Sequence, residues 1–465
     1  MHEYKKNDRL ELDIKDISQD GLGIGKADGY AVFVKDTVPG DKVLAGLTKV
    51  KKNYAFGRLI NVLAPSPDRI EPRCPVALSC GGCQIQMMDY SAQLSMKEDK
   101  VKNDMARIGG FENPPMEPIA FMKDPWRYRN KAQVPVGRDK QGNLCAGFYA
   151  GRTHSVIPFS DCLLAPAEFQ TIIDAILDWM RENHLQPYEE ETGRGLVRHI
   201  LIRKGFATGE ILVCLIANLA AGKELPAAGK LADKLKNLSL NPCLGETGIV
   251  GITLSRNTRK TNVILGSKPE VIWGRSYLED LIGPIRYRIS SVSFYQVNPA
   301  QTVKLYERAL ECAALTGRET VLDLYCGIGT ISLFLAQKAK KVIGVEIVEQ
   351  AVEDARENAR LNDIDNAEFY AGKAEEVVPE LFEKGLKHAD VVVVDPPRKG
   401  LDQTLIDTVL KINPDRIVYV SCDPATLARD TKLLCQGGYD LKSVKPYDQF
   451  AHSVHVETVC LLTHS

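Results

Sequence analysis

The feature that most constrains the fold is an alternation of short apolar segments with amphipathic helical segments, from about residue 290 to residue 465. Segments that are apolar at successive positions are typical of strands buried on both faces, as in a parallel sheet covered by helices. We therefore expect a Rossmann-like α/β domain over residues 290–465, a doubly wound sheet that binds ligands at the carboxyl ends of its strands. The apolar segments lie in TVLDLYCG, KVIGVEI, AEFYAG, ADVVVVDPP, RIVYVSCDP and VETVCLLTH.

The rest of the chain is long enough for further domains, because a single hydrophobic core stops growing at about 250–300 residues. Residues 1–62 contain short alternating strand patterns separated by turn signals, which predict an OB-like β-barrel. A proline-rich joint then leads into residues 63–289, where strand and helix patterns predict an α+β domain. A helical segment at residues 90–115 is a candidate to pack on the C-terminal domain instead.

The composition gives no general signal for a nucleic-acid partner, because 59 Lys and Arg against 60 Asp and Glu leave a formal net charge of −1. RNA binding must therefore rest on local patches. No apolar segment approaches the roughly 18 residues of a membrane span, and the N-terminus lacks a signal-peptide pattern. We expect a cytoplasmic, monomeric protein without a membrane partner.

Three basic stretches are candidates for RNA contact. The last hairpin of the expected barrel carries four cations with Tyr54 and Phe56 between them. The run WRYRNK, with Arg127, Arg129 and Lys131, could stack on a base and neutralise phosphates, and the run RHILIR covers residues 198–203. Each stretch is also compatible with an ordinary solvated strand. The four hairpin cations are Lys49, Lys51, Lys52 and Arg58.

A glycine-rich turn follows the first apolar segment of the C-terminal domain, in VLDLYCGIGT. Glycines in such a turn let the backbone approach a ligand closely. Glu346 follows Gly327 by 19 residues at the end of the next segment, the position of the ribose-hydroxyl reader in nucleoside-binding sheets. The spacing fits either a dinucleotide or S-adenosylmethionine, and the missing third glycine of G-x-G-x-x-G favours the methyl donor.

The segment ADVVVVD brings Asp395 to the same edge, followed by Pro-Pro-Arg398. Asp-Pro-Pro at this place occurs in amino-group methyltransferases, which usually have an aromatic residue in the fourth position to stack on the target base. Arg398 stands in that position here, which weakens the amino-group interpretation.

The next segment ends in Cys422, at the entry to a helix, where the positive end of the helix can stabilise a thiolate. Carbon 5 of uracil is too weakly nucleophilic to take a methyl group unaided, and a thiolate that adds to carbon 6 supplies the electron density. A base must then remove the carbon 5 proton. The candidate base is Glu457, at the start of the last strand. These residues predict a uridine-5 methyltransferase, and activity that survived loss of Cys422 would favour the amino-group alternative.

A cluster of three cysteines, Cys74, Cys80 and Cys83, lies upstream of the catalytic domain. Two cysteines in a C-x-x-C pattern with a third nearby indicate a metal site, and thiolate ligation suits zinc or an iron–sulfur cluster. A fourth ligand is required. The candidates are Cys145, Cys162, Cys214 and Cys243.

Taken together, the motifs SCDPATLARD, H-x-E, DLYCGIGT, DPPRKG and SFYQVN closely resemble the RNA (uracil-5-)-methyltransferase family over essentially the whole chain. The resemblance implies that Cys422 is the nucleophile and Glu457 the proton acceptor. It also implies S-adenosylmethionine as the cofactor. The residues that it implies for contact with this donor are Gln296, Tyr325, Glu346 and Asp395. The adenine contact stays unassigned, because this chain has Gly-Lys-Ala at residues 372–374.

The resemblance further implies a 4Fe–4S cluster on Cys74, Cys80, Cys83 and Cys162, an arrangement seen in the members that act on 23S rRNA. It likens the N-terminal barrel to a TRAM domain. Both features make 23S rRNA the expected substrate, with tRNA as the alternative substrate. A further alternative, an RNA-binding module without catalysis, has no need of Cys422, Glu457 and an intact donor site.

Overall fold

The computed structural model describes residues 4–151, 153–240, 248–266 and 268–464 of the chain. They form two compact units. Unit 1 comprises Met1–Asp99, Phe148–Ile157 and Phe450–His455, and unit 2 comprises Lys100–Gly147, Pro158–Gln449 and Val456–Ser465. The boundaries expected at residues 62 and 289 fall inside the strands Tyr54–Ala64 and Ile285–Ser290. They do not coincide with the limits of these units and stay a prediction.

The N-terminal strands form a closed barrel in the order β1-β2-β3-β5-β4, which confirms the expected OB-like fold. Alternate residues point inward, so that Leu12 and Ile14 of β1 pack against Val32 and Val34 of β3 in the barrel core. The strands are β1 (Arg9–Ile17), β2 (Gly23–Ala27), β3 (Tyr30–Val34), β4 (Lys42–Val50) and β5 (Tyr54–Ala64). The helix α1 (Tyr90–Arg107) follows the cysteine-bearing segment.

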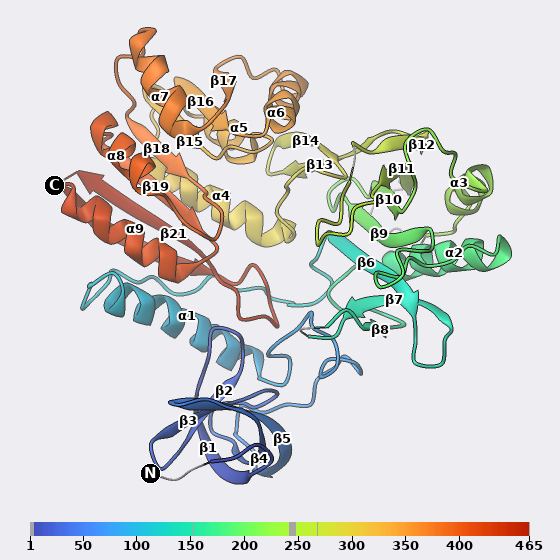
Figure 1. Cartoon of the computed structure of the whole chain (residues 1–465). Helices are drawn as coiled ribbons and strands as arrows, with labels where there is room; N and C mark the ends of the chain where they lie inside the picture. Colours follow the sequence, from blue (N-terminus) through green and yellow to red (C-terminus); the bar gives the residue numbers. More distant parts are fainter. Residues whose placement is uncertain (1–3, 152, 241–247, 267, 465) are drawn as a thin grey trace. The chain divides into compact units, whose positions relative to one another are not determined.

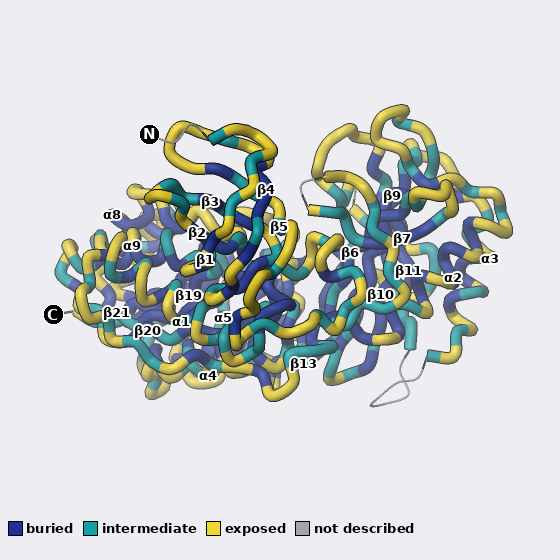
Figure 2. Tube along the Cα trace, turned by 90° about the horizontal axis from the view of Figure 1, so that it is seen from below, coloured by how far each residue is buried: buried dark blue, intermediate teal, exposed yellow. Residues whose placement is uncertain are grey.

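A seven-stranded mixed sheet with the order β12-β11-β10-β9-β6-β7-β8 forms the middle of the chain. Its central strands β9 and β10 are buried at almost every position, as Figure 2 shows along both strands, so both faces of the sheet are covered there. The strands are β6 (Lys131–Arg138), β7 (Leu144–Tyr149), β8 (Val156–Pro158), β9 (Val197–Lys204), β10 (Ile211–Ala217), β11 (Ile249–Arg256) and β12 (Glu270–Gly274). The helices of this region are α2 (Glu168–Glu182) and α3 (Ala228–Lys236).

The C-terminal sheet has the order β17-β16-β15-β18-β19-β21-β20, in which β21 runs antiparallel to its neighbours. This is the expected doubly wound, mostly parallel sheet. A small hairpin, β13 (Tyr277–Ile282) and β14 (Ile285–Ser290), precedes it. The sheet strands are β15 (Thr320–Leu324), β16 (Lys341–Glu346), β17 (Ala367–Ala371), β18 (Val391–Val394), β19 (Arg416–Ser421), β20 (Tyr439–Tyr447) and β21 (Glu457–His464).

Helices cover both faces of this sheet (Figure 1). The helices α4, α5 and α6 share one apolar cluster with the hairpin and with Val321, Val393 and Val420 of the sheet. The helices α7, α8 and α9 pack against one another in turn, and α9 also contacts β19 and β20. Their bounds are α4 (Pro299–Ala313), α5 (Thr330–Ala336), α6 (Glu349–Leu361), α7 (Ala374–Glu383), α8 (Gln403–Ile412) and α9 (Pro424–Gln436).

An extended segment after α1 adds to the free edge of the C-terminal sheet. Met116 and Ala120 form parallel bridges with Val444 and Tyr447 of β20. Glu117 lies on this segment and makes ion pairs with Arg308 and Lys445. Sequence reasoning placed this segment in the middle domain, and its backbone pairing shows that it extends the C-terminal sheet.

Among the described helices, none combines the length and the apolar character that crossing a membrane requires.

Candidate active site

The glycine-rich turn after β15 has a backbone that ordinary residues rarely adopt. Tyr325, Gly327 and Gly329 all have positive φ angles, of 73°, 56° and 81°. Glycine adopts such angles at no energetic cost, whereas tyrosine is strained by them. Strained backbone of this kind occurs often at ligand sites. A side chain at Gly329 would press on Phe369, whereas one at Gly327 would enter open space. The turn therefore leaves exposed backbone at the carboxyl edge of the sheet.

Glu346 lies beside this turn at the end of β16. Its carboxylate accepts hydrogen bonds from the Gly327 N–H at 3.2 Å and from the Val348 N–H at 2.9 Å. Because Leu324 pairs with Val345 in the parallel register, the two strands end at the same level. The turn and the carboxylate thus form one preorganised structure, in which two backbone donors fix the acid.

Gln296 is buried in the segment that leads into α4 and accepts hydrogen bonds from two distant residues. The Asn130 side chain donates to its carbonyl oxygen at 2.9 Å. The Gln449 amide donates to its Oε1 at 3.4 Å, and the Gln449 carbonyl accepts from Asn298 at 3.1 Å. Asn298 is also the N-cap of α4. The position of Gln296 therefore depends on residues from two distant parts of the sequence, around Asn130 and Gln449.

Three buried carboxyl groups are linked through Asp395, which is affected by Asp323 and itself affects Glu457. Burial raises the pKa of Asp323 and of Asp395 to about 7 each, and each acid is further affected by another acid nearby. Burial, with Asp395 as the second cause, raises the pKa of Glu457 to about 8. Sequence reasoning missed Asp323, which is fully buried and accepts a hydrogen bond of 2.5 Å from the Ser332 hydroxyl.

Cys422 and Glu457 are placed together by the antiparallel pairing of β19 with β21. Ser421 pairs with Thr458, so one further step along the same register sets Cys422 opposite Glu457. Glu457 is only 3% exposed, and its Oε2 makes no hydrogen bond within the described residues. A buried acceptor without a partner is costly in a folded protein. Glu457 Oε2 can therefore accept a hydrogen bond, and Glu457 is close enough to Cys422 to raise the pKa of its thiol.

The thiol of Cys422 is not activated by the helix in the way that we expected. Burial first, and Glu457 and Asp395 next, raise the pKa of Cys422 to about 11. The Asp423 side chain caps α9 and accepts hydrogen bonds from the N–H groups of Ala425 and Thr426, both at 3.1 Å. A carboxylate therefore occupies the helix end that was expected to favour the thiolate.

The segment from Asp395 to Leu401 brings a cation to this group of acids. Arg398 lowers the pKa of both Cys422 and Glu457, although burial outweighs it in each case. The segment is held against α9, because the Arg429 guanidinium donates to the carbonyls of Lys399 and Leu401, both at 3.0 Å. The buried Asp430 carboxylate accepts from the Leu401 N–H at 2.7 Å. We did not single out Arg429 and Asp430 in the sequence, although both lie within SCDPATLARD.

The cysteines predicted as metal ligands occur in both units. Cys74, Cys80 and Cys83 lie in unit 1 and Cys162 in unit 2, and their convergence stays a prediction. The Gly82 N–H lies 3.3 Å from Cys80 Sγ, the kind of backbone contact that stabilises a thiolate. Cys145 and Cys214 are buried, and burial raises the pKa of each thiol, which disfavours a ligating thiolate. Cys243 lies outside the described residues.

The basic hairpin of the barrel has the exposure that RNA contact requires. All four of its predicted cations are exposed, and Tyr54 packs edge-on against Phe33 and Phe56 with ring centroids 5.7 and 5.6 Å away. The Tyr30 hydroxyl donates to the carbonyls of Lys51 and Tyr54, both at 2.6 Å, which fixes the hairpin turn. The hairpin therefore presents cations beside a firmly held aromatic cluster.

Arg127 has structural partners of its own. Its guanidinium pairs with the Asp161 carboxylate at 2.5 Å and donates to the carbonyls of Cys162 and Ala165 at 3.1 and 2.9 Å. Arg127 therefore fixes the segment around Cys162, and its contact with RNA phosphates stays a prediction.

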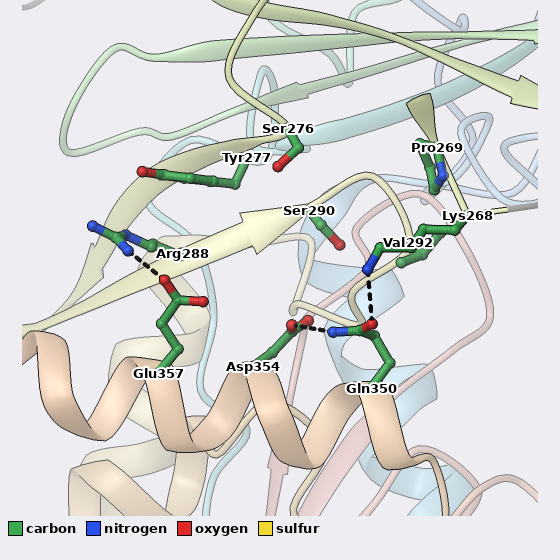
Figure 3. A pocket seen from close by; sticks show the side chains of 10 residues that line it. All are labelled: Lys268, Pro269, Ser276, Tyr277, Arg288, Ser290, Val292, Gln350, Asp354 and Glu357. Atoms are coloured by element: carbon green, nitrogen blue, oxygen red, sulfur yellow. Dashed lines mark hydrogen bonds and ion pairs between the residues drawn. The ribbon is translucent and has the colours of Figure 1, made fainter. Parts of the chain in front are cut away.

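A separate cavity of about 210 Å³ lies between the β13–β14 hairpin and α6 (Figure 3). Its polar side chains largely engage one another: Arg288 pairs with Glu357, and the Gln350 amide donates to Asp354 at 3.1 Å. The cavity is lined by Lys268, Pro269, Ser276, Tyr277, Arg288, Ser290, Val292, Gln350, Asp354 and Glu357. None of the predicted catalytic or donor-contact residues is among them.

Two family models match the sequence. The model described as tRNA (Uracil-5-)-methyltransferase matches residues 275–465, which include the C-terminal sheet and all of the predicted catalytic and donor residues. The model described as TRAM domain matches residues 5–60, which form the barrel.

Curated relatives match the chain over nearly its full length. An uncharacterized RNA methyltransferase of Halalkalibacterium halodurans is 48% identical over 457 residues, which are 98% of this chain and 97% of the relative. Another from Listeria innocua is 46% identical over 459 residues, covering 99% of this chain and 98% of the relative.

A solved structure shares the architecture of the whole chain. The tRNA (uracil-54, C5)-methyltransferase of Pyrococcus abyssi, in complex with S-adenosyl-L-homocysteine, superposes with a TM-score of 0.77 at 27% identity. The match covers 98% of this chain and 100% of that one.

Proposed function

This chain belongs to the S-adenosylmethionine-dependent RNA (uracil-5-)-methyltransferase family, and we propose that it methylates carbon 5 of uridine in RNA with Cys422 as nucleophile and Glu457 as base. The observation that carries the proposal is the placement of these two side chains. Cys422 directly follows the last pair of the β19–β21 register, Ser421 with Thr458, and Glu457 begins β21. Both therefore lie at the carboxyl edge of the sheet that carries the donor turn. A thiol and a carboxyl group at one end of a nucleoside-binding fold are the two groups that this chemistry requires.

The thiolate of Cys422 adds to carbon 6 of the uracil ring, which moves electron density to carbon 5. The bound S-adenosylmethionine supplies an electrophilic methyl group. After the methyl group has been transferred, Glu457 takes the proton from carbon 5, the carbon 6–sulfur bond breaks, and the thiolate is released. Arg398 favours the charged forms of both side chains, since it lowers the pKa of each.

The donor is proposed to contact Gln296, Tyr325, Glu346 and Asp395. Glu346 is fixed by two backbone N–H groups beside the glycine turn, which suits a carboxylate that accepts hydrogen bonds from ribose hydroxyls. The open space above Gly327 suits a ligand that lies close to the backbone. Gln296 is already held by hydrogen bonds from Asn130 and Gln449, so it loses little conformational freedom when the donor binds.

We also propose a 4Fe–4S cluster on Cys74, Cys80, Cys83 and Cys162. Four thiolates are a suitable donor set for this cluster. Three of the cysteines are spaced within one short partly exposed segment, and the Gly82 N–H already lies at hydrogen-bonding distance from Cys80 Sγ. Zinc in the same thiolates is the alternative, and metal analysis distinguishes the two.

Ribosomal RNA is the substrate that we favour, specifically 23S rRNA, because the chain combines the cysteine cluster with the barrel. Transfer RNA is the second candidate, because the Pyrococcus abyssi enzyme that matches 98% of this chain acts on tRNA. The two proposals share the chemistry and differ only in the RNA.

The test is to locate 5-methyluridine in 23S rRNA and in tRNA from cells with the gene, without it, and with the Cys422→Ala variant. We expect at least one 23S rRNA uridine to lose its methyl group in the last two strains. Loss from tRNA alone would assign the enzyme to tRNA. If no 5-methyluridine is lost in either RNA, the proposed function is wrong.

A further inference from the structure

Three cationic side chains gather where β6 and β9 meet. Lys131 is the first residue of β6, and Arg203 of β9 is its direct cross-strand partner. Directly paired residues project from the same face of a sheet. Arg129 lies two residues before Lys131, and its Nε donates to the Lys131 carbonyl at 3.2 Å. Arg129 and Arg203 are close enough to Lys131 to disfavour its charged form.

Within the residues that the structure describes, no ion pair joins Arg129, Lys131 or Arg203 to a carboxylate. The neighbouring cations are different: Lys204 pairs with Glu168 at 2.6 Å, and Arg127 pairs with Asp161 at 2.5 Å.

Burial raises the free-energy cost of a positive charge that has no counter-ion. Arg203 is 3% exposed, and its Nε lacks a hydrogen-bond partner among the described residues. Burial lowers the pKa of Arg203 to about 10, and burial with the two arginines lowers the pKa of Lys131 to about 7. A buried charge without a counter-ion is unfavourable, and a bound anion relieves it. Lys131 and Arg129 are only half-buried, so a ligand can reach the cluster from solvent.

The cluster adjoins the segment that carries Gln296. Arg203 Nη2 donates to the carbonyl of Ser293. Asn130, between the other two cations, donates from its backbone N–H to the Val297 carbonyl at 2.8 Å and from its side chain to the Gln296 carbonyl at 2.9 Å. Arg203 and Asn130 therefore fix the cluster to the segment that carries Gln296, one of the residues proposed to contact the methyl donor.

We propose that Arg129, Lys131 and Arg203 bind a backbone phosphate of the RNA strand that carries the target uridine. The inference rests on the proposed function, because it takes RNA as the substrate. The other anion available here is the carboxylate of the methyl donor. That donor also carries an ammonium and a sulfonium group and is a net cation, which a cluster of three cations disfavours. RNA carries one negative charge for each nucleotide and no compensating cation.

The experiment compares Lys131→Gln and Arg129→Gln with the control Lys140→Gln in the full-length protein. Lys140 is exposed and lies in the turn after β6, and the control replaces a lysine with the same glutamine. The probe is a short labelled single-stranded RNA that contains uridine, titrated at several salt concentrations. Each cluster variant is expected to lower the slope of log affinity against log salt by about 0.7, the value for one phosphate contact in a single strand. Lys140→Gln and Lys131→Arg should keep the wild-type slope.

Two results would overturn the proposal. One is a wild-type salt slope in both cluster variants. The other is an unchanged RNA affinity together with weaker S-adenosylmethionine binding, which would assign the cluster to the donor carboxylate. If Lys131→Gln fails to fold, as its thermal melt will show, Arg129→Gln decides, because Arg129 is half-exposed. RNA binding is measured without methyl transfer. If the wild type forms no 5-methyluridine but the cluster variants still lower the salt slope, the proposed uridine chemistry is wrong and the phosphate site is supported.

Discussion

Acids rather than cations dominate the immediate surroundings of Cys422. Glu457 and Asp395 raise the pKa of its thiol, and Arg398 is the cation that opposes them. A thiol with a pKa of about 11 is mostly protonated at neutral pH, so the ligand-free protein keeps its nucleophile unreactive. The donor-bound protein has an additional positive charge, and nucleophilic attack is therefore expected to depend on prior donor binding.

Replacing Glu457 with Gln should separate the two halves of the reaction. The amide cannot accept the carbon 5 proton, so attack and methyl transfer should proceed while product release slows, and a covalent protein–RNA adduct should accumulate on denaturing gels. Removing the carboxylate should also lower the pKa of Cys422, because Glu457 contributes more than any other group to raising that pKa, after burial. Alkylation of Cys422 at a series of pH values measures that shift. Wild-type turnover without an adduct would place the base elsewhere.

Asp323 should make stability depend on pH. Its pKa is about 7 in the folded protein and 3.8 ordinarily, so the folded state holds its proton more tightly. The resulting contribution to stability is fully present below about pH 4 and is lost as the pH rises through 7. Asp323→Asn removes the titration, so the free energy of unfolding of the wild type relative to this variant should fall between pH 4 and pH 7. Denaturant titrations that give parallel pH profiles for the two proteins would contradict this.

At the scale of elements, strand ends and their connections build the site. The β19–β21 register positions Cys422 and Glu457, and the turn after β15 holds Glu346. The segment with Arg398 follows β18, and α9 fixes it through Arg429 and Asp430. Each functional group thus lies within a few residues of a rigid strand or helix. The side chains of the site therefore lose little conformational freedom when the substrate binds.

The barrel hairpin should contribute to RNA affinity through charge. The double variant Lys51→Ser, Lys52→Ser should lower affinity and reduce the salt slope by about 1.4–1.8, since each phosphate contact contributes about 0.7–0.9. Binding of S-adenosylmethionine should not change. The matched control, Lys15→Ser with Lys26→Ser, removes the same charge from exposed positions of β1 and β2. Equal slopes for the two double variants would show that the hairpin has no special role.

At the scale of the whole molecule, the apolar patterns were sufficient to predict the folds of the barrel and the C-terminal sheet. The patterns could not show burial, so neither the raised pKa of Asp323 nor that of Glu457 was predictable. They also could not show long-range partners. The ion pair of Arg127 with Asp161, which lies 34 residues further along the chain, is an example. The carboxylate of Asp423 caps α9 and opposes a thiolate at Cys422, and this became apparent only in three dimensions.

The proposed 4Fe–4S cluster predicts the iron content of the purified protein. Anaerobically purified protein should be brown and contain about four irons per chain, as a four-cysteine cubane requires. Cys80→Ser should lose most of the iron, whereas Cys435→Ser, which changes a partly exposed thiol on α9, should not. Stoichiometric zinc without iron in the wild type would refute the cluster.

The central claim is covalent catalysis at Cys422, and RNA that contains 5-fluorouridine tests it most directly. Glu457 cannot remove fluorine from carbon 5 as it removes a proton, so the methylated adduct should persist. We predict that, with S-adenosylmethionine present, mass spectrometry of digested protein finds the nucleotide on the peptide that contains Cys422. Cys422→Ala should form no adduct and no 5-methyluridine in ordinary RNA. Methylation of ordinary RNA by Cys422→Ala, or an adduct on another cysteine, would contradict the account.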